Sequence, residues 1–281
     1  MQVDRITDSI TEHGEGPVWS PSWGGLRWVD MTAGDVLSLA ADGSVTRTHV
    51  GTIAAAVRPR DRGGAVIAVE RSFLLEEPDG TTTQLPPVWS DPTIRMNEGG
   101  CAPDGSFYCG SMAYDKRVGA ASLYRLAPDR TVTVVLDGVT VSNGLDWSPD
   151  GSQAYYNDTD THRIDTFSWN ADVGLHDRRP FVAIPDGGRP DGLTVDAEGG
   201  VWTALANGGA VHRYSADGRL DAVIELPAHK VTACTFGGDD LRTLFITTSR
   251  EGLRAGEDPL AGSLFSCRPG VDGLPVRSFA G

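Results

Sequence analysis

The sequence has 281 residues, of which 40% are apolar and 22% are charged, and it contains 35 glycines and 17 prolines. Its 24 Lys and Arg against 38 Asp and Glu give a net charge of −14. So acidic a chain repels phosphate backbones and anionic lipid, and we therefore expect neither nucleic acid nor a membrane as its partner.

The N-terminal segment MQVDRITDSI lacks the apolar core of a signal peptide. The most apolar runs, such as Ala65–Val69, are too short to cross a bilayer. The four cysteines form no CxxC pair, so neither a zinc site nor a redox motif is expected. We therefore expect a cytoplasmic protein with reduced thiols. Cys101 and Cys109 lie in one hairpin, but no disulfide is expected between them.

Short β-type runs alternate with turns rich in Gly, Asp and Pro along the whole chain, and long amphipathic helical periods are absent. One unit recurs, consisting of an apolar strand, a turn of the Pro-Asp-Gly type, and a second strand rich in aromatic and small residues. In chain order the copies are Val18–Gly25 before LRWVD, Val57–Gly63 before GAVIAVE, Cys101–Gly105 before SFYCGSM, Trp147–Gly151 before SQAYYND, Val195–Gly199 before GVWTAL, and Phe236–Asp240 before LRTLFITT.

The copies follow one another at roughly 40–48 residues, a period typical of propeller blades. A further strand pair lies between copies, for example GAVHRYSADGRLDAVIEL with its Asp217-Gly218 hairpin turn. Six units of four strands predict an all-β fold: a six-bladed β-propeller with four antiparallel strands per blade, forming a single domain over residues 1–281. A β-sandwich is the competing architecture, but it gives no reason for a repeat of this length.

In a propeller the innermost strand of each blade lines the central channel, so residues just before that strand lie at the channel mouth. Asp191 precedes the predicted strand Leu193–Asp196, whereas Asp196–Gly199 is the hairpin turn at the opposite face, where we expect no catalysis. The equivalent positions at the mouth in the other units are Glu15, Arg95, Asn97, Glu98 and Asn143, with His229, Lys230 and Thr232 in the sixth unit and little beyond Thr52 in the second.

Glu15, Asn97, Asn143 and Asp191 together would form a site of hard oxygen ligands. Two carboxylates without a cation repel each other and raise one pKa, and a divalent cation removes that conflict. Such ligands suit Ca, Mg, Mn, Zn or Fe(II), and the sequence does not choose among them. Each residue also has a simpler interpretation, because Asn-Gly and Asp-Gly are common turn dipeptides. The recurrence of an oxygen ligand at one register of several units favours the site.

Several longer motifs occur in a defined order over nearly the whole chain. They are EGPVW (15–19), RMNEGGCAPDGSFYCGSM (95–112), SNGLDWSPDGSQAYYNDT (142–159), RPDGLTVDAEGGVWTA (189–204), KVTACTFGGDDLRTLFITT (230–248) and the closing GSLFSCRPGVDGLPVRSF. In these motifs the chain resembles the SMP-30/gluconolactonase/LRE (regucalcin-like) family of sugar lactonases. The resemblance implies a six-bladed propeller with one catalytic divalent metal in its channel.

The resemblance also assigns roles to matching positions. It implies the metal ligands Glu15, Asn143 and Asp191 and the substrate-binding residues Arg95 and Asn97. Many members have Asp where this chain has Glu98, and the additional methylene would reshape the sugar pocket. Tyr114, which follows CGSM, would line the same pocket.

The expected reaction is metal-dependent hydrolysis of a sugar (aldono-) lactone to the aldonic acid. The metal would act as a Lewis acid and stabilise the oxyanion, Asp191 would accept or shuttle a proton, and Arg95 would donate hydrogen bonds to substrate oxygens. No GxSxG elbow is present. His13 and His229 are further candidate pocket residues.

Other functions fit the same residues less completely. A phosphotriesterase-type hydrolase would also use a metal in the channel. The convergence of Glu15, Asn143, Asp191 and Arg95 argues against a non-enzymatic calcium-binding or interaction propeller, because an interaction propeller needs no metal ligands in its channel. A propeller of the strictosidine-synthase type would not need the three-ligand set. The sugar and the metal stay open, and so does the choice between a monomer and a small homo-oligomer.

Overall fold

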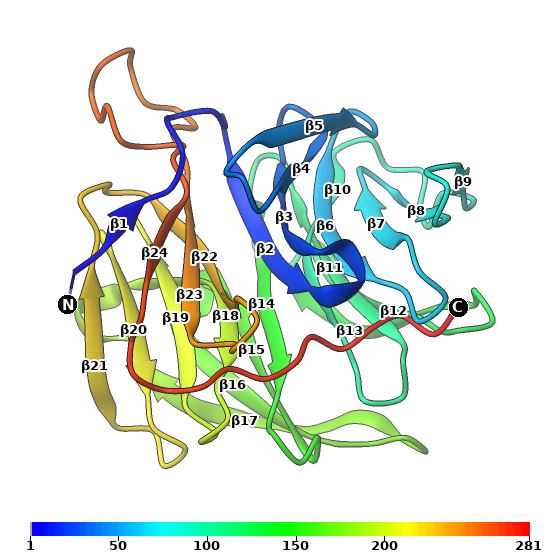
Figure 1. Cartoon of the computed structure of the whole chain (residues 1–281). Helices are drawn as coiled ribbons and strands as arrows, with labels where there is room; N and C mark the ends of the chain where they lie inside the picture. The colour runs from blue at the N-terminus through cyan, green and yellow to red at the C-terminus, as the bar shows by residue number, and fades with distance from the viewer. Residues whose placement is uncertain (1) are drawn as a thin grey trace.

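The computed structural model describes residues 2–281 as six four-stranded antiparallel sheets (Figure 1). The innermost strands of the sheets contact one another in the cyclic order β2, β6, β10, β14, β18 and β22, and β22 returns to β2. The six sheets therefore form a ring around a central channel. This arrangement confirms the predicted six-bladed β-propeller with four antiparallel strands per blade.

The strands of each blade run outward from the channel in chain order, except in the last blade. The first blade consists of β2 (Gly14–Ser20), β3 (Gly25–Asp30), β4 (Asp35–Leu39) and β5 (Val45–His49). The second consists of β6 (Ala54–Pro59), β7 (Ala65–Val69), β8 (Ser72–Glu76) and β9 (Thr82–Gln84). The third consists of β10 (Ile94–Cys101), β11 (Phe107–Ala113), β12 (Ala121–Leu126) and β13 (Val132–Val139).

The second half of the chain repeats this pattern. The fourth blade consists of β14 (Ser142–Trp147), β15 (Gln153–Asp158), β16 (Arg163–Asn170) and β17 (Gly174–Ala183). The fifth consists of β18 (Arg189–Val195), β19 (Val201–Ala206), β20 (Ala210–Tyr214) and β21 (Leu220–Glu225). The sixth contains β22 (Val231–Gly237), β23 (Thr243–Thr248) and β24 (Phe265–Cys267), with short 3-10 turns elsewhere at Pro21–Trp23, Thr159–Thr161 and Pro185–Gly187.

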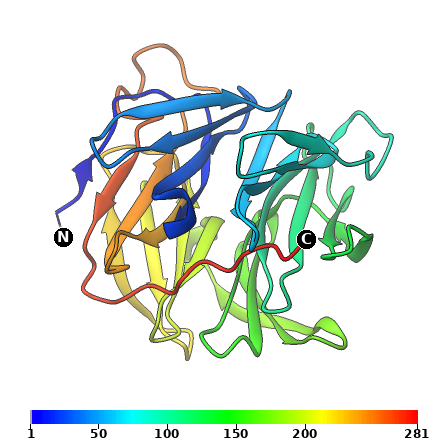
Figure 2. The same cartoon turned by 45° about the vertical axis from the view of Figure 1, so that its right-hand side comes forward.

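The sixth blade takes its outermost strand from the start of the chain. The strand β1 (Asp4–Arg5) pairs with β24, placing Asp4 opposite Ser266 and Arg5 opposite Phe265. Figure 2 shows this blue N-terminal strand beside the red-orange strands of the last blade. The two ends of the chain thus close the ring through backbone pairing, which the repeat pattern in the sequence did not predict.

Aromatic side chains pack between neighbouring blades. Tyr108 meets Trp147 edge to face with ring centroids 5.7 Å apart, and Trp202 meets Phe236 in the same way at 5.8 Å. In each pair one ring comes from the second strand of a blade and the other from the innermost strand of the next blade. This packing explains the aromatic residues of the second strand in the repeat, because each buries a large apolar surface between two sheets.

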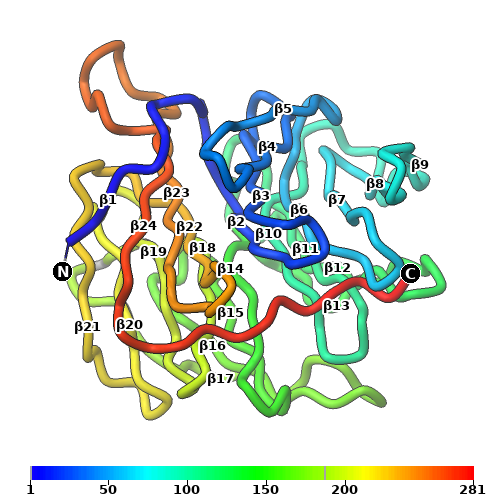
Figure 3. The backbone as a smooth tube through the Cα atoms, viewed as in Figure 1, coloured from blue at the N-terminus to red at the C-terminus, as the bar shows by residue number. Residues whose placement is uncertain are grey.

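The segment after β24 crosses the face that carries the hairpin turns of the innermost strands (Figures 1 and 3). Gly273 bridges to Asp196 in the fifth blade, and the Arg277 guanidinium donates to the Ser148 carbonyl in the fourth at 3.3 Å. Further on, the Ala280 amide donates to the Gly105 carbonyl of the third blade at 2.9 Å. The tail therefore ties together blades that are distant in sequence.

Every innermost strand has a register shift at the same level of the channel. The shifts lie between Glu15 and Val18, Ala54 and Ala56, Met96 and Gly99, Ser142 and Leu145, Pro190 and Leu193, and Val231 and Ala233. A β-bulge bends a strand and redirects its side chains. Asp191 thus lies inside β18 at a bulge, not before the strand as the sequence predicted.

Two glycines at these bulges are required by close packing of neighbouring blades. A Cβ on Gly144 would lie 2.4 Å from the Leu193 backbone nitrogen, and a Cβ on Gly192 would lie 2.4 Å from the Ala233 Cβ. Neither glycine has a positive φ. The Asn143-Gly144 and Asp191-Gly192 pairs are therefore not reverse turns, and their glycines allow adjacent innermost strands to approach each other.

All four cysteines in the described residues are free and buried, and Cys109 lies opposite Gly99 rather than Cys101. Among residues 2–281 no helix is both long enough and apolar enough to cross a membrane.

Candidate active site

A cavity of about 220 Å³ opens at the end of the channel where the innermost strands begin. Of the residues predicted from the sequence, its walls include Glu15, Arg95, Asn97, Tyr114, Asn143 and Asp191, together with His13, Lys230 and Thr232. Because the second strand of each blade runs antiparallel to the first, its last residues lie at the same end of the channel. Both strand starts and strand ends therefore supply side chains to the cavity.

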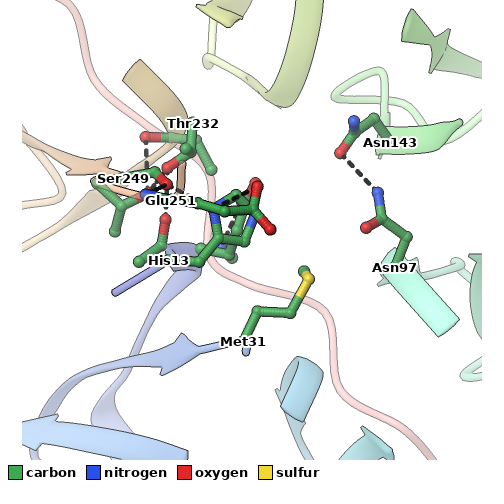
Figure 4. Close-up of polar contacts among 12 residues, drawn as sticks. His13, Met31, Asn97, Asn143, Thr232, Ser249 and Glu251 are labelled. Atoms are coloured by element: carbon green, nitrogen blue, oxygen red, sulfur yellow. Dashed lines mark hydrogen bonds and ion pairs between the residues drawn. The ribbon is translucent and has the colours of Figure 1, made fainter. Parts of the chain in front are cut away.

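Asn143 is held with its amide oxygen toward the cavity residues. Its Nδ2 donates to the Thr159 hydroxyl at 2.8 Å, and that hydroxyl donates to the Pro190 carbonyl at 2.8 Å. The Oδ1 of Asn143 then accepts from Asn97 Nδ2 at 3.2 Å (Figure 4). Since the nitrogen of Asn143 already has its acceptor, the oxygen is the atom available to a cation.

Arg95 continues this network on the third blade. Its Nη1 donates to Asn97 Oδ1 at 2.7 Å and to the Met96 carbonyl at 2.9 Å, and it contacts the Met31 sulfur at 3.0 Å. Burial lowers the pKa of the Arg95 guanidinium from its usual value. A buried guanidinium fixed at one nitrogen presents its remaining N–H groups in a rigid geometry, which suits recognition of substrate oxygens.

The two carboxylates of the cavity, Glu15 and Asp191, are electrostatically unfavourable in their charged forms. Burial raises the pKa of Glu15 well above its usual value, and the neighbouring Asp191 raises it further. Burial likewise raises the pKa of Asp191, and Glu98 adds to that rise. Glu15 accepts one bond from the Gly16 amide at 3.1 Å. In the described chain neither carboxylate has a Lys or Arg within ion-pair distance.

His13 lies on the opposite wall in a small polar cluster (Figure 4). Its Nδ1 lies 2.7 Å from the Ser249 hydroxyl, and its Nε2 lies 3.8 Å from Glu15 Oε1. Burial lowers the pKa of His13 to about 4, so the imidazole is neutral at physiological pH. A neutral imidazole here adds no positive charge that would compete with a cation at Glu15. His229 is not among the residues that line the cavity.

Tyr114 stands at the rim and is 46% exposed. Its hydroxyl donates to Glu70 at 2.6 Å, and the guanidinium carbon of Arg95 lies 5.9 Å from its ring centre. Burial and the hydrogen bond to Glu70 raise the pKa of Tyr114 to about 12. The ring therefore stays neutral and covers one side of Arg95.

Glu98, grouped with the substrate-binding residues from the sequence, does not line this cavity. It lines a second, smaller cavity of about 60 Å³ further along the channel, together with Arg58 and Asp146. The bulge between Met96 and Gly99 explains this placement, because it sends adjacent side chains to different levels of the channel. Burial raises the pKa of Glu98 to about 7, and its Oε2 has no hydrogen-bond partner among residues 2–281.

Sequence reasoning missed several residues of the cavity. Among them are Thr32, Lys116, Thr159, Arg189, Asn207, Ser249 and Glu251. Most follow the second strand of a blade, as Lys116 follows β11 and Glu251 follows β23. Extending each repeat past the end of its second strand would have found all of these except Arg189, which begins β18. The sequence analysis did this only for Tyr114, which follows β11.

The side chains present fit a divalent cation. Glu15 and Asp191 supply two buried carboxylates without a cationic partner, and Asn143 supplies an oriented amide oxygen. Oxygen donors of this kind are the ligands of hard divalent ions. The described residues contain no cluster of three or more His, Cys, Asp or Glu side chains suited to a metal. The candidate set has only two such side chains, and the amide is its third member.

The fold and the cavity define a six-bladed propeller with an oxygen-rich, carboxylate-bearing site at one end of its channel. Residues 13–250 match the model described as the SMP-30/Gluconolactonase/LRE-like region. The chain therefore belongs to the SMP-30/gluconolactonase/LRE-like family, as its motifs predicted.

Individual relatives cover almost all of the chain. It is 34% identical to regucalcin of Danio rerio, over 100% of this chain and 99% of the relative. It is 35% identical to the 6-deoxy-6-sulfogluconolactonase of Pseudomonas putida, over 95% of both chains. Its structure resembles that of the calcium-binding protein regucalcin from Agrobacterium tumefaciens with a TM-score of 0.92 and 28% identity, covering 99% of this chain and 97% of that one.

Proposed function

We propose that this protein is a metal-dependent lactonase that hydrolyses a sugar lactone to the aldonic acid. The observation that carries the proposal is the pair of buried carboxylates, Glu15 and Asp191, which lie beside an oriented amide oxygen and a buried arginine in one cavity. Membership of the family and the lactonase activity named for the Pseudomonas putida relative support it.

Glu15, Asn143 and Asp191 would hold one divalent ion. When bound, this ion supplies Lewis-acid polarisation of the lactone carbonyl. Its identity among Ca, Zn, Mn, Mg and Fe(II) is not fixed by two carboxylates and an amide, because all of these ions accept oxygen ligands.

The chain's own groups orient the substrate and move the proton. Arg95 donates from its fixed guanidinium to lactone oxygens, and Asn97 keeps that guanidinium in place through the 2.7 Å bond to its Oδ1. The carboxylate of Asp191 accepts the proton of the attacking water as the new C–O bond forms. That proton passes to the ring oxygen when the ring C–O bond breaks, so the products are one carboxylic acid and one hydroxyl group.

The decisive experiment compares metal-stripped protein refilled with each divalent ion on a panel of neutral lactones, using a pH-indicator assay. We expect Asp191→Ala and Asn143→Ala to lose both metal binding, measured by calorimetry, and hydrolysis, while the far-UV circular dichroism stays unchanged. Loss of oriented catalytic and metal-binding groups typically lowers kcat/KM by about 10²-fold or more.

Asp129→Asn is a matched control, because it makes a similarly small change in an exposed turn between β12 and β13. It should keep wild-type activity. Full activity of Asp191→Ala after chelation would contradict the proposed mechanism. Metal binding with hydrolysis rates that do not differ among the lactones or the added metals would instead favour a calcium-binding propeller without enzymatic activity. Hydrolysis of phosphotriesters alone would favour the phosphotriesterase alternative.

A further inference from the structure

The rim of the active-site cavity carries positive charge on a strongly acidic protein. The chain as a whole has a net charge of −14, yet the exposed or half-exposed charged residues in the cavity wall are Lys116, Arg189, Lys230 and Glu251. Three of these four side chains are cations. Arg95 adds another positive charge deeper in the cavity. The exposed charged side chains at the rim are therefore mostly positive, in contrast with the acidic chain as a whole, and such an excess of cations attracts anions.

Two of the rim cations already have partners. Arg189 Nη2 donates to Asp160 Oδ1 at 2.5 Å, and Lys230 Nζ donates to the Glu251 carbonyl at 2.5 Å. Lys116 differs from both, because no ion pair or side-chain hydrogen bond involves its ammonium group within residues 2–281. It is the rim cation that is available to a ligand.

The loop that carries Lys116 is fixed around it. The Lys116 amide donates to the Ala113 carbonyl at 2.9 Å, and its backbone has a φ of 56°, a left-handed conformation that is uncommon for lysine. The neighbouring Arg117 contacts Asp115 at 3.1 Å and donates to the Thr93 hydroxyl at 2.9 Å. The side chains of Asp115 and Arg117 are therefore paired with each other. The backbone of Lys116 is fixed by its amide hydrogen bond, and its side chain lines the cavity.

Lys116 and Arg189 line the same cavity as Asp191. Burial dominates the pKa of Asp191 and raises it, whereas Arg189 and Lys116 both lower it. Lys230 precedes β22 in the sixth blade, which lies across the ring from the third blade that carries Lys116. Lys116 follows β11 in the third blade, and Arg189 is bonded to Asp160 of the adjacent fourth blade. Both line the cavity that contains Asp191, and together they could hold an anionic group attached to a bound lactone.

We propose that the preferred lactone carries a second, anionic group, and that Lys116, assisted by Arg189, binds this group at the rim. The inference rests on the proposed lactone hydrolysis and adds a substrate class to it. The groups that would fit this site share one property, a negative charge on the sugar carbon furthest from the lactone carbonyl. A phosphate, a sulfonate and a carboxylate all meet this description.

The test measures kcat/KM for gluconolactone and for its 6-phosphate, 6-sulfonate and 6-carboxylate counterparts, at low and at physiological salt. We expect at least one anionic lactone to exceed the neutral one by about tenfold, and the preference to fall as salt increases. The three anionic lactones distinguish the sources of the charge. Lys116→Gln should remove most of the preference.

Lys230→Gln is a matched control, because it removes the same charge from the other wall of the rim and should change the ratio by less than about twofold. Equal kcat/KM for neutral and anionic lactones in the wild type would overturn the inference. So would an unchanged ratio in Lys116→Gln, or equal losses in both variants, which would indicate only a general effect of net charge.

A second readout separates this inference from the proposed function. Calorimetry on metal-stripped protein compares gluconate with 6-phosphogluconate, which need no hydrolysis. Tighter binding of the phosphorylated acid, weakened about tenfold by Lys116→Gln, would support the anion site even if no lactone were hydrolysed. Equal affinity for the two acids would contradict the anion site while leaving lactone hydrolysis unaffected.

Discussion

Asp191 in β18 and Asp196 in the following hairpin turn are both buried, but they differ in their hydrogen bonds. This difference distinguishes a structural carboxylate from a candidate catalytic one. Asp196 is fully buried and accepts bonds from the Gly200 amide at 2.8 Å, from Trp202 Nε1 at 2.8 Å and from Arg213 Nε at 2.7 Å. Asp191 is also buried, but no hydrogen bond contributes to its raised pKa. The carboxylate without donors is the one that a cation would stabilise.

Glu98 leads to a prediction about pH and stability. Its pKa of about 7 lies above the usual value of a glutamate because of burial, so the protonated carboxyl favours the native state. This stabilisation of the native state is fully present below the usual pKa of a glutamate, and it is lost as the pH rises through the pKa of about 7 that Glu98 has in the native state. We therefore expect Glu98→Gln, which cannot ionise, to resemble the wild type near about pH 4.5 and to be more stable by about 2–3 kcal/mol near about pH 8.

Urea unfolding of metal-stripped protein at the two pH values checks this prediction. The wild type should lose stability between them, and the Glu98→Gln variant should lose less. If both proteins show the same pH dependence, the pKa of Glu98 is not raised in the native state and its carboxyl is ionised at neutral pH.

At the scale of the elements, the bulges in the innermost strands provide the geometry of the site. Glu15, Asn97, Asn143, Asp191 and Thr232 each lie at or beside a register shift, in five different blades. A regular strand would alternate its side chains between the two neighbouring blades. The bulge breaks that alternation at one level of the channel, so the five side chains converge there.

Gly192→Ala tests whether the bulge in β18 depends on this close approach. The added Cβ would lie 2.4 Å from the Ala233 Cβ and 2.8 Å from its Cα, so the backbone of β18 or β22 must move. We expect a loss of about 1–3 kcal/mol in the free energy of unfolding, together with weaker metal binding because Asp191 moves too.

Gly51→Ala is the control for this variant. Its added Cβ would meet nothing closer than 3.8 Å, and its φ is not positive. It should stay within about 1 kcal/mol of the wild type in urea unfolding. A Gly192→Ala protein as stable as Gly51→Ala would mean that the bulge tolerates a side chain.

At the scale of the whole molecule, the ends of the chain hold the ring together. The strand β1 completes the sixth blade, and the tail after β24 crosses the fifth, fourth, third and second blades. Phe279 anchors the tail, because its side chain is fully buried in the core cluster of the first three blades. These contacts join segments at opposite ends of the sequence.

Phe279→Ala should therefore destabilise the whole propeller. Removing a fully buried phenylalanine leaves a cavity and costs about 3–5 kcal/mol. Chemical denaturation would measure this loss, and Val118→Ala, at a position 88% exposed, should show almost none. If Phe279→Ala unfolds at the wild-type denaturant concentration, the tail does not contribute to the stability of the ring.

The sequence predicted most of the fold and much of the candidate site, and its errors have a common cause. The repeat predicted six blades, because alternating strands and Pro-Asp-Gly turns are local signals. It also grouped Glu15, Asn143 and Asp191 at one level. It misplaced Glu98 and put Asp191 before its strand rather than inside it, because a bulge depends on a neighbouring strand that no local pattern reveals.

The amino-acid sequence by itself determined the strands, their number and the residue types that reach the channel, because alternation and turn chemistry act over a few residues. Only the tertiary structure decided which carboxylates remain without partners, which wall carries Lys116, and how β1 and the tail close the ring. These features depend on contacts between segments far apart in the chain. Burial and hydrogen bonding at such contacts set the charge and orientation of each side chain, and neither exists until the blades have packed together.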